Sequence, residues 1–190
     1  MKKLTLFASA LLLATASFGQ MTWALDKSHT KLGFTTTHLM MSETSGEFKN
    51  YDVKLSSKAE DFVDATLDVT VDVNSVNTNE DKRDAHLKSP DFFDAAKYPT
   101  ITYKSKTFKK VDGKKYKVTG DLTMHGVTKP VDLDVTLIGV GDHPFNKKRV
   151  AGFKFTTTVK RADFTLGSAT PGAIIGDEIN IFGSMEFFKN

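Results

Sequence analysis

Histidine is the residue of this chain best suited to acid–base or metal chemistry, and the sequence holds five copies: His29, His38, His86, His125 and His143. No two of them have the i, i+2 spacing of metal ligands on a strand or the i, i+4 spacing of ligands on a helix. A zinc or copper site needs two or three neighbouring imidazoles. The sequence therefore predicts no metal site. A metal-assisted periplasmic hydrolase stays an alternative that requires His29, His38 and a carboxylate to meet in the fold.

Other residue types form no catalytic motif either. Asp84 and His86 are two positions apart, so on a helix their side chains do not face each other. No serine lies in a nucleophile-elbow motif, and no glycine-rich loop is built to hold phosphate. Arg161 and Asp163 in "KRADFTLG" suit a structural ion pair. We therefore predict a protein that is not an enzyme, with no catalytic residue and no cofactor.

Composition excludes further classes of function. The chain of 190 residues has no cysteine, which rules out disulfides, thiol catalysis, cysteine zinc sites and a cysteine-attached lipid anchor. Its formal charge is +3, and Lys2 and Lys3 at the N-terminus supply most of that excess. Such a balance gives no electrostatic case for nucleic acid as a partner.

The first nineteen residues have the three-part pattern of a secretory signal peptide. Lys2 and Lys3 begin it, an apolar run covers residues 4–16, and the small residues Ser17 and Gly19 follow. The run is shorter than the roughly 20 residues that span a bilayer. We predict a signal peptide at 1–19 and one domain at 20–190, located in the periplasm or secreted, with no stable membrane anchor.

The remaining chain alternates apolar and polar residues with period two, which is typical of strands that are buried on one side. Eight such segments lie near residues 32–38, 48–55, 65–73, 101–103, 116–124, 131–137, 153–159 and 179–187.

Only residues 77–99 lack this alternation, and they predict a short helix near 80–88, capped by Asn79. Short connections with turn residues favour an all-β, eight-stranded antiparallel barrel with a short helix after the third strand. A packed β-sandwich that acts as an interaction protein is the alternative.

The inward faces of these strands leave two interpretations open. They carry large side chains such as Phe34, Phe153, Phe155 and Phe187, which would fill a packed core. They also carry small residues, namely Thr36, Ala65, Gly120, Thr157 and Gly183. Small residues among large ones leave unfilled volume that destabilises a core unless a ligand occupies it.

Several stretches of the sequence resemble one known family. They are "WALDKSHTKLGFTTTHL" (23–39), "SGEFKNYD" (45–52), "NTNEDKRDAHLKSPDFFDAAKYPTITY" (77–103), "GDLTMHGVTKPVDLDVTLIG" (120–139) and "RADFTLG" (161–167). In this order and spacing, the chain resembles the YceI-like, polyisoprenoid-binding periplasmic proteins. The stretch from 77 to 103 is the most specific of these.

The resemblance implies a lipocalin-like barrel with an elongated apolar cavity. It also implies an isoprenoid ligand, such as a polyprenol or the tail of a quinone, bound for transport, storage or a stress response. It implies no catalysis. Strand alternation, supported by this fold, predicts the residues that contact the ligand: Leu32, Phe34, Thr36, His38, Phe48, Leu67, Val69, Val71, Ile101, Tyr103, Leu122, Met124, Leu133, Val135, Phe153, Phe155, Ile179, Ile181 and Gly183.

We also predict roles for residues at the ends of the barrel and on its outer surface. We expect Thr36, His38 or Tyr103 to hydrogen-bond a ligand head group at the mouth. Asp84 and His86 are expected to hold the helix across one end of the barrel. Outward apolar residues could pair two barrels in a homodimer.

Overall fold

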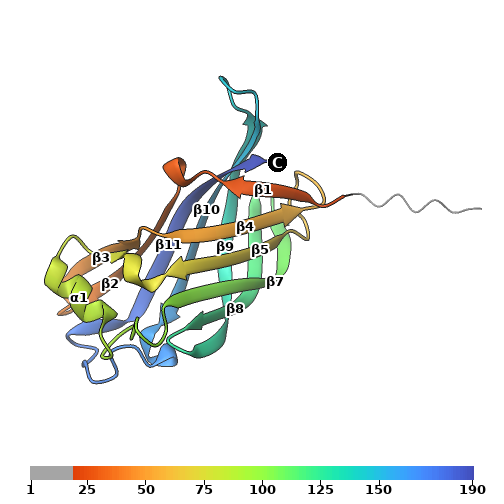
Figure 1. The fold of residues 1–190 in the computed structure, drawn as a ribbon. Coiled ribbons are helices and arrows are strands. Elements are labelled where there is room, and N and C mark those ends of the chain that lie inside the picture. Colours follow the sequence, from red (N-terminus) through yellow and green to blue (C-terminus); the bar gives the residue numbers. More distant parts are fainter. Residues whose placement is uncertain (1–18) are drawn as a thin grey trace, which may run out of the picture.

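The structure is a computed structural model that describes residues 19–190. The predicted signal peptide therefore lies outside the described residues except for Gly19. Eight antiparallel strands close into a barrel, because β11 pairs with β1 as well as with β10 (Figure 1). In order around the ring they are β1 (Met21–Leu25), β4 (Tyr51–Ser57), β5 (Thr66–Asp72), β7 (Thr100–Asp112), β8 (Lys115–Met124), β9 (Val127–Asp142), β10 (Arg149–Lys160) and β11 (Ile175–Lys189). The predicted eight-stranded antiparallel barrel is confirmed, and the alternative of a packed sandwich is wrong.

Three further strands extend one side of the barrel. They are β2 (Lys31–His38), β3 (Ser42–Phe48) and the two-residue β6 (Val76–Asn77). The C-terminal end of β11, residues 187–189, pairs with β1, and its N-terminal part, residues 175–184, pairs with β2. The sequence did not predict β1. It treated residues 48–55 as one strand with an irregularity after Phe48, where the structure instead ends β3 and begins β4.

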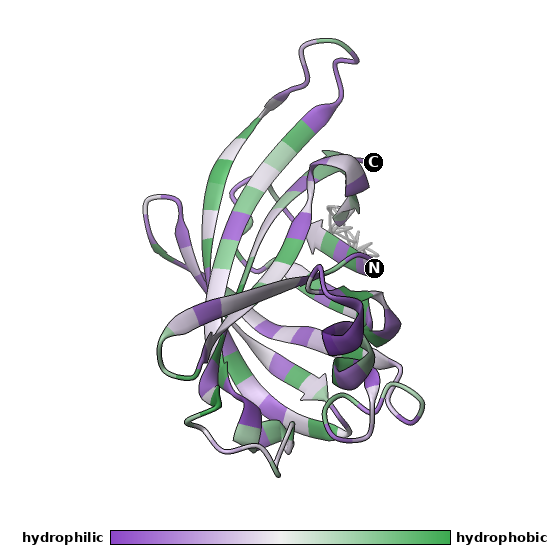
Figure 2. Cartoon of the chain, turned by 90° about the vertical axis from the view of Figure 1, so that its left-hand side faces the viewer, coloured by the Kyte–Doolittle hydropathy of each residue, from purple (hydrophilic) through white to green (hydrophobic). Residues whose placement is uncertain are grey.

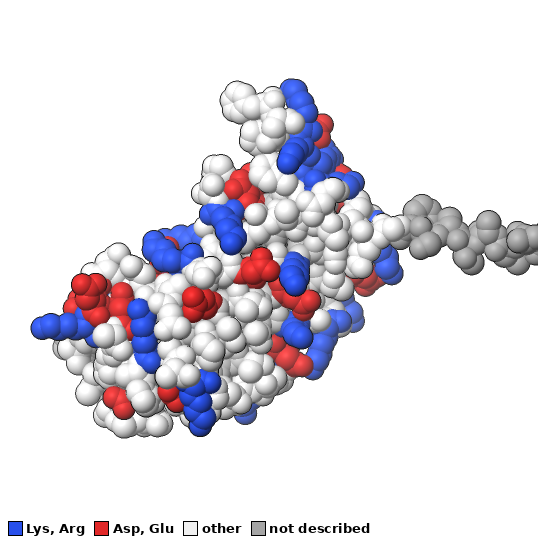
Figure 3. Space-filling model, in the orientation of Figure 1, with Lys and Arg blue, Asp and Glu red and all other residues white. Residues whose placement is uncertain are grey.

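Alternation along the strands decides which side chains enter the core. In β8, every second residue from Tyr116 to Met124 is buried, and the residues that alternate with them are more exposed. The same alternation of hydrophobic and hydrophilic bands follows the strands in Figure 2. On the outer face shown in Figure 3, basic and acidic side chains are mixed.

One end of the barrel is sealed by aromatic side chains. The ring centroids of Trp23 and Phe62 are 5.1 Å apart, and those of Phe62 and Phe153 are 4.9 Å apart. Phe187 packs on Phe153 in an edge-to-face arrangement at 6.0 Å. The indole Nε1 of Trp23 donates a hydrogen bond to Ser57 Oγ at 3.0 Å. These residues form a plug that we call the aromatic plug.

The other end carries the single α-helix of the described residues, α1 (Asp81–Lys88). The predicted cap, Asn79, is wrong: Asn79 has a left-handed backbone, and the Glu80 carboxylate instead accepts hydrogen bonds from the Lys82 and Arg83 amides. Within the described chain, no helix is long and apolar enough to cross a bilayer.

Asp84 ties this helix to the barrel. Its buried carboxylate accepts hydrogen bonds from the Thr78 amide at 2.8 Å and from the Thr78 hydroxyl at 2.5 Å. The same hydroxyl accepts a hydrogen bond from Arg83 Nε at 2.8 Å. Thr78 follows β6 directly, so the network anchors α1 at the edge of the sheet.

We expect the Asp84→Ala variant to lose about 2–3 kcal/mol of unfolding free energy, because the buried Thr78 amide is left without an acceptor. Denaturant unfolding measures this loss. His86→Ala is the matched control, since the His86 ring is largely exposed: it packs edge-on against Phe92 and lies 3.3 Å from the exposed Asp91 carboxylate. It should lose no more than about 1 kcal/mol. Equal losses in the two variants would contradict the anchoring role of Asp84.

The hairpin that joins β9 and β10 projects beyond the barrel (Figure 1). Its tip carries Phe145, which is 89% exposed, beside the basic residues Lys147, Lys148 and Arg149. The tip precedes the start of β10, and the last residue of β10, Lys160, lies at the helix end of the barrel. The tip and α1 are therefore separated by the length of that strand, roughly 40 Å for twelve residues.

Candidate ligand-binding cavity

An apolar cavity of about 580 Å³ occupies the barrel interior. This volume lies within the range of about 300–1,000 Å³ that is usual for small-molecule sites. Every predicted ligand contact except Gly183 lines it. The alternation in the sequence therefore identified the inward face of nearly every strand.

Gly183 is absent from the lining because an aromatic ring takes its place. A Cβ atom at position 183 would lie 2.2 Å from the ring of Phe155. Gly120 behaves in the same way, since a Cβ there would lie 2.6 Å from the ring of Tyr103. The two glycines were predicted to leave unfilled volume, and that prediction is wrong: they make room for neighbouring rings.

The hollow lies elsewhere along the inward faces. Phe34, Leu67, Val69, Phe155 and Ile181 point into the cavity and yet are only half-buried. Their inner surfaces lack partner atoms, so the dispersion contacts of a packed core are missing there. An apolar molecule in the cavity would supply those contacts.

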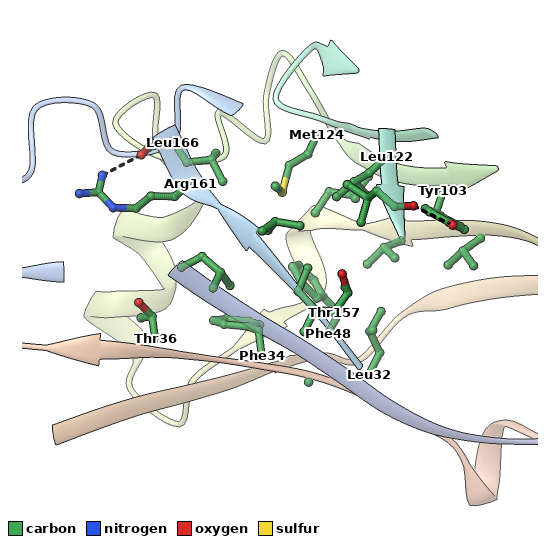
Figure 4. A pocket seen from close by; sticks show the side chains of 18 of the residues that line it. Leu32, Phe34, Thr36, Phe48, Tyr103, Leu122, Met124, Thr157, Arg161 and Leu166 are labelled. Carbon is green, nitrogen blue, oxygen red and sulfur yellow. Dashed lines mark hydrogen bonds between the residues drawn. The ribbon is translucent and has the colours of Figure 1, made fainter. Parts of the chain in front are cut away.

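Side chains from several strands of the barrel line the cavity (Figure 4). Its deep end reaches Phe153 and Phe187 of the aromatic plug. Its exposed lining residues all lie near α1 and the end of β2: Thr37, His38, Lys82, Arg83, His86 and Ile174. These residues define the mouth.

The three predicted head-group contacts lie at different depths. His38 is exposed at the mouth. The Thr36 hydroxyl donates to the carbonyl oxygens of Gly176 and Glu178, at 3.2 and 3.3 Å. Tyr103 lies away from the mouth, and its hydroxyl is 3.1 Å from the carbonyl oxygens of both Val118 and Val131. Burial raises the pKa of the Tyr103 hydroxyl. The placement of Tyr103 at the mouth was therefore wrong.

Arg161 is a lining residue that the sequence did not identify. The predicted ion pair with Asp163 does not form. The buried guanidinium instead donates to backbone carbonyl oxygens between 2.6 and 3.3 Å away, those of Leu166, Gly167, Thr170, Ile175 and Gly176. The carbonyls belong to the segment 166–176, which forms one wall of the mouth. Arg161 therefore holds that wall in shape.

The sequence also missed the apolar residues that the non-alternating segments bring to the cavity. They are Leu87, Phe92, Phe93, Leu166, Ile174 and Ile175. Their apolar character was visible, but loops and short helices have no period-two pattern that assigns a side chain to one face.

The histidines do not form one cluster, although His38 and His86 both line the mouth. His29 lies next to β1, near the aromatic plug, and His38 ends β2 at the mouth, roughly 25–30 Å away along the strand. The hydrolase alternative needed these two residues to meet, and they do not. His29, Asp26 and Glu186 do bring their ligand atoms within 4.8 Å of one another. His29 Nδ1 already lies 2.9 Å from Asp26 Oδ2, as in a structural ion pair.

This pair should give stability a defined pH dependence. The hydrogen bond between the two side chains raises the pKa of His29 above 6.5 and lowers the pKa of Asp26 below 3.8. The His29 contribution is complete below pH 6.5 and is lost as pH rises through the raised pKa. The Asp26 contribution is present above pH 3.8 and is lost as pH falls through the lowered pKa. The pair therefore stabilises the fold most between about pH 4 and 6.5.

NMR titration of the His29 ring measures this effect. The His29 pKa should lie above its usual value in the wild type and return toward it in the Asp26→Asn variant. A wild-type His29 that titrates at or below its usual pKa would rule out the pair.

Eight closed antiparallel strands around an apolar cavity define the chain as a lipocalin-like β-barrel. Residues 23–187 match the family model of the YceI-like domain, and the chain belongs to this family. It is not a known enzyme family.

Relatives and solved structures agree with this assignment. The chain is 39% identical to protein YceI of Escherichia coli over 170 residues, which covers 87% of this chain and 88% of the relative. It is 35% identical to the YCEI protein of Campylobacter jejuni, whose crystal structure superposes with a TM-score of 0.74 over 81% of this chain and 90% of that one. A polyisoprenoid binding domain from Saccharophagus degradans shares the fold at 17% identity, with a TM-score of 0.64 over 88% of this chain and 98% of that one.

Proposed function

We propose that the chain binds one long apolar lipid, an isoprenoid such as a polyprenol or a quinone tail, inside the barrel. The observation that carries this proposal is the hollow apolar cavity of about 580 Å³, whose exposed lining residues gather at one end. The proposed binding residues are the predicted ligand contacts that line this cavity, which are all of them except Gly183. No resident cofactor and no catalytic step are part of the proposal.

The energetics favour such a ligand. Each buried methylene contributes about 0.8 kcal/mol, so a five-carbon isoprene unit contributes roughly 3–4 kcal/mol before ordering of the chain is subtracted. The lining needs no polar partner for the tail. The Saccharophagus degradans domain described as polyisoprenoid binding supports this choice of ligand, since its fold is the same.

The proposal includes export. Residues 1–19 have the pattern of a signal peptide, and the mature chain would carry or store the lipid in the periplasm or outside the cell. In an aqueous compartment, an isoprenoid chain needs a protein that shields it from water.

The test is to purify the exported protein without detergent, extract it with organic solvent and analyse the extract by mass spectrometry. We expect a single isoprenoid at a ratio of about one molecule per protein chain. The intact mass of the protein should match a chain that starts at Gln20. An empty extract from folded protein, combined with no binding of added quinone, would overturn the proposed function.

A further inference from the structure

Exposed apolar side chains border one part of the mouth, beside the end of β2. Leu39, Met40, Met41 and Ile174 are 49%, 71%, 89% and 44% exposed. The Leu39 amide donates a hydrogen bond to the Ile174 carbonyl at 2.9 Å, so the two segments adjoin. We call these four residues the apolar rim. The rim is continuous with the cavity, because Ile174 and His38, the neighbour of Leu39, both line it.

The turn that carries Leu39, Met40 and Met41 has backbone angles that large apolar residues disfavour. Leu39, Met40 and Met41 connect β2 to β3, and a hydrogen bond from the Met41 amide to the His38 carbonyl closes a tight turn centred on Leu39 and Met40. Both residues have positive φ, 52° and 56°. Hairpin loops with two positive φ values favour Asn-Gly, because large side chains are strained there. Here the positions hold two large apolar residues that point into solvent.

A covering surface would compensate for this exposure. We propose that the apolar rim docks on a lipid bilayer and places the mouth against it, so that the ligand passes between bilayer and cavity without crossing water. This inference rests on the proposed function. A bilayer is favoured over a protein partner because the rim borders the opening through which the proposed lipid must pass, next to His38 and Ile174 of the lining.

The charges beside the rim fit that orientation. Lys82 of α1 lines the mouth, and its side chain would lie at the level of lipid phosphates when the rim is inserted. The neighbouring Arg83 side chain is held by Thr78. The rim residues themselves are uncharged. Binding should therefore persist on neutral vesicles and in high salt, unlike binding through the distant basic hairpin tip.

Flotation with phosphatidylcholine vesicles in 1 M salt tests the proposal on the full mature chain. The double variant Leu39→Asn, Met40→Gly places the preferred residues in the turn, so it should unfold no more easily than the wild type. We expect its partition onto vesicles to fall at least tenfold. Phe145→Ser is the matched control: it removes a side chain as exposed as Met41 from the far end of the molecule and should leave partition unchanged.

A fluorescence measurement supports the same conclusion from a single position. A tryptophan introduced as Met41→Trp should shift its emission to shorter wavelength when vesicles are added, and one introduced as Phe145→Trp should not. No flotation of the wild type, or an equal loss in Phe145→Ser, would overturn the docking proposal. The docking proposal would also be overturned if the wild type were a dimer, and if the double variant were a monomer that binds vesicles as well as the wild type. In that case the rim would serve only to join two copies of the chain.

The two proposals can fail separately. Quinone added from solution should bind the double variant as tightly as the wild type, because the cavity is untouched. Normal quinone uptake without vesicle binding would reject docking alone. Vesicle binding by a protein that takes up no isoprenoid would reject the proposed function.

Discussion

The Val69→Trp variant should fold normally and lose its lipid. Val69 points from β5 into the hollow part of the cavity, where it is only half-buried. A tryptophan there would occupy roughly the space of one isoprene unit, which corresponds to about 3–4 kcal/mol of ligand binding. The affinity for an isoprenoid should therefore fall by a factor of roughly 10²–10³. Fluorescence titration with a quinone measures the change.

The neighbouring residue provides the control for this substitution. Thr70 is next to Val69 on β5 but is exposed on the outer face. Thr70→Trp adds the same bulk outside the barrel and should bind quinone like the wild type. Both variants should keep their unfolding free energy within about 1 kcal/mol, since Val69→Trp fills space rather than displacing packed atoms. Unchanged affinity in Val69→Trp would mean that the ligand does not occupy this part of the cavity.

The Arg161→Ala variant should show the largest loss of stability. The substitution removes a buried guanidinium that donates to carbonyl oxygens of the segment 166–176. Those carbonyls lose their charged donor, and the wall of the mouth loses its cross-link. We expect a loss of about 3–5 kcal/mol in unfolding free energy, measured by denaturant unfolding with the m-value checked for two-state behaviour.

Two further variants separate this role from the predicted ion pair. Asp163→Asn should change stability by no more than about 0.5 kcal/mol, because Asp163 is exposed and does not bind Arg161. Arg161→Lys keeps the charge but cannot reach all the carbonyls with one ammonium group, so it should fall between the wild type and Arg161→Ala. A strong effect of Asp163→Asn would restore the ion-pair interpretation.

Alternation was sufficient to predict most of the barrel strands, though not β1, and most of their inward side chains. A residue such as Val69 or Leu133 lies on a face set by its neighbours along the chain, and closure of the barrel turns that face inward. The helix at 81–88 was predicted nearly to its ends, because the pattern changes abruptly there. These features depend on the local sequence and on the closure of the strands into a barrel.

Features that depend on distant residues could not be predicted in this way. A glycine in a strand does not tell whether a ring or a void lies opposite, so Gly183 was misassigned. Asp163 is near Arg161 in sequence, but the folded loop offers closer acceptors in its own backbone. Tyr103 was placed at the mouth because alternation gives the face of a residue and not its depth along the barrel axis. The volume of the cavity likewise depends on how all the strands pack together.

The aromatic plug makes the cavity a tube with one closed end. The depth of such a tube limits the length of ligand chain that fits inside it. The proposed isoprenoid would enter tail first and stop at Phe153 and Phe187, which line the deep end. Any length beyond the depth of the tube must stay outside, together with the head group. Entry and exit also use the same opening, so a resident molecule must leave before the next can enter. Exchange should therefore proceed at the rate of departure, whatever the concentration of the newcomer.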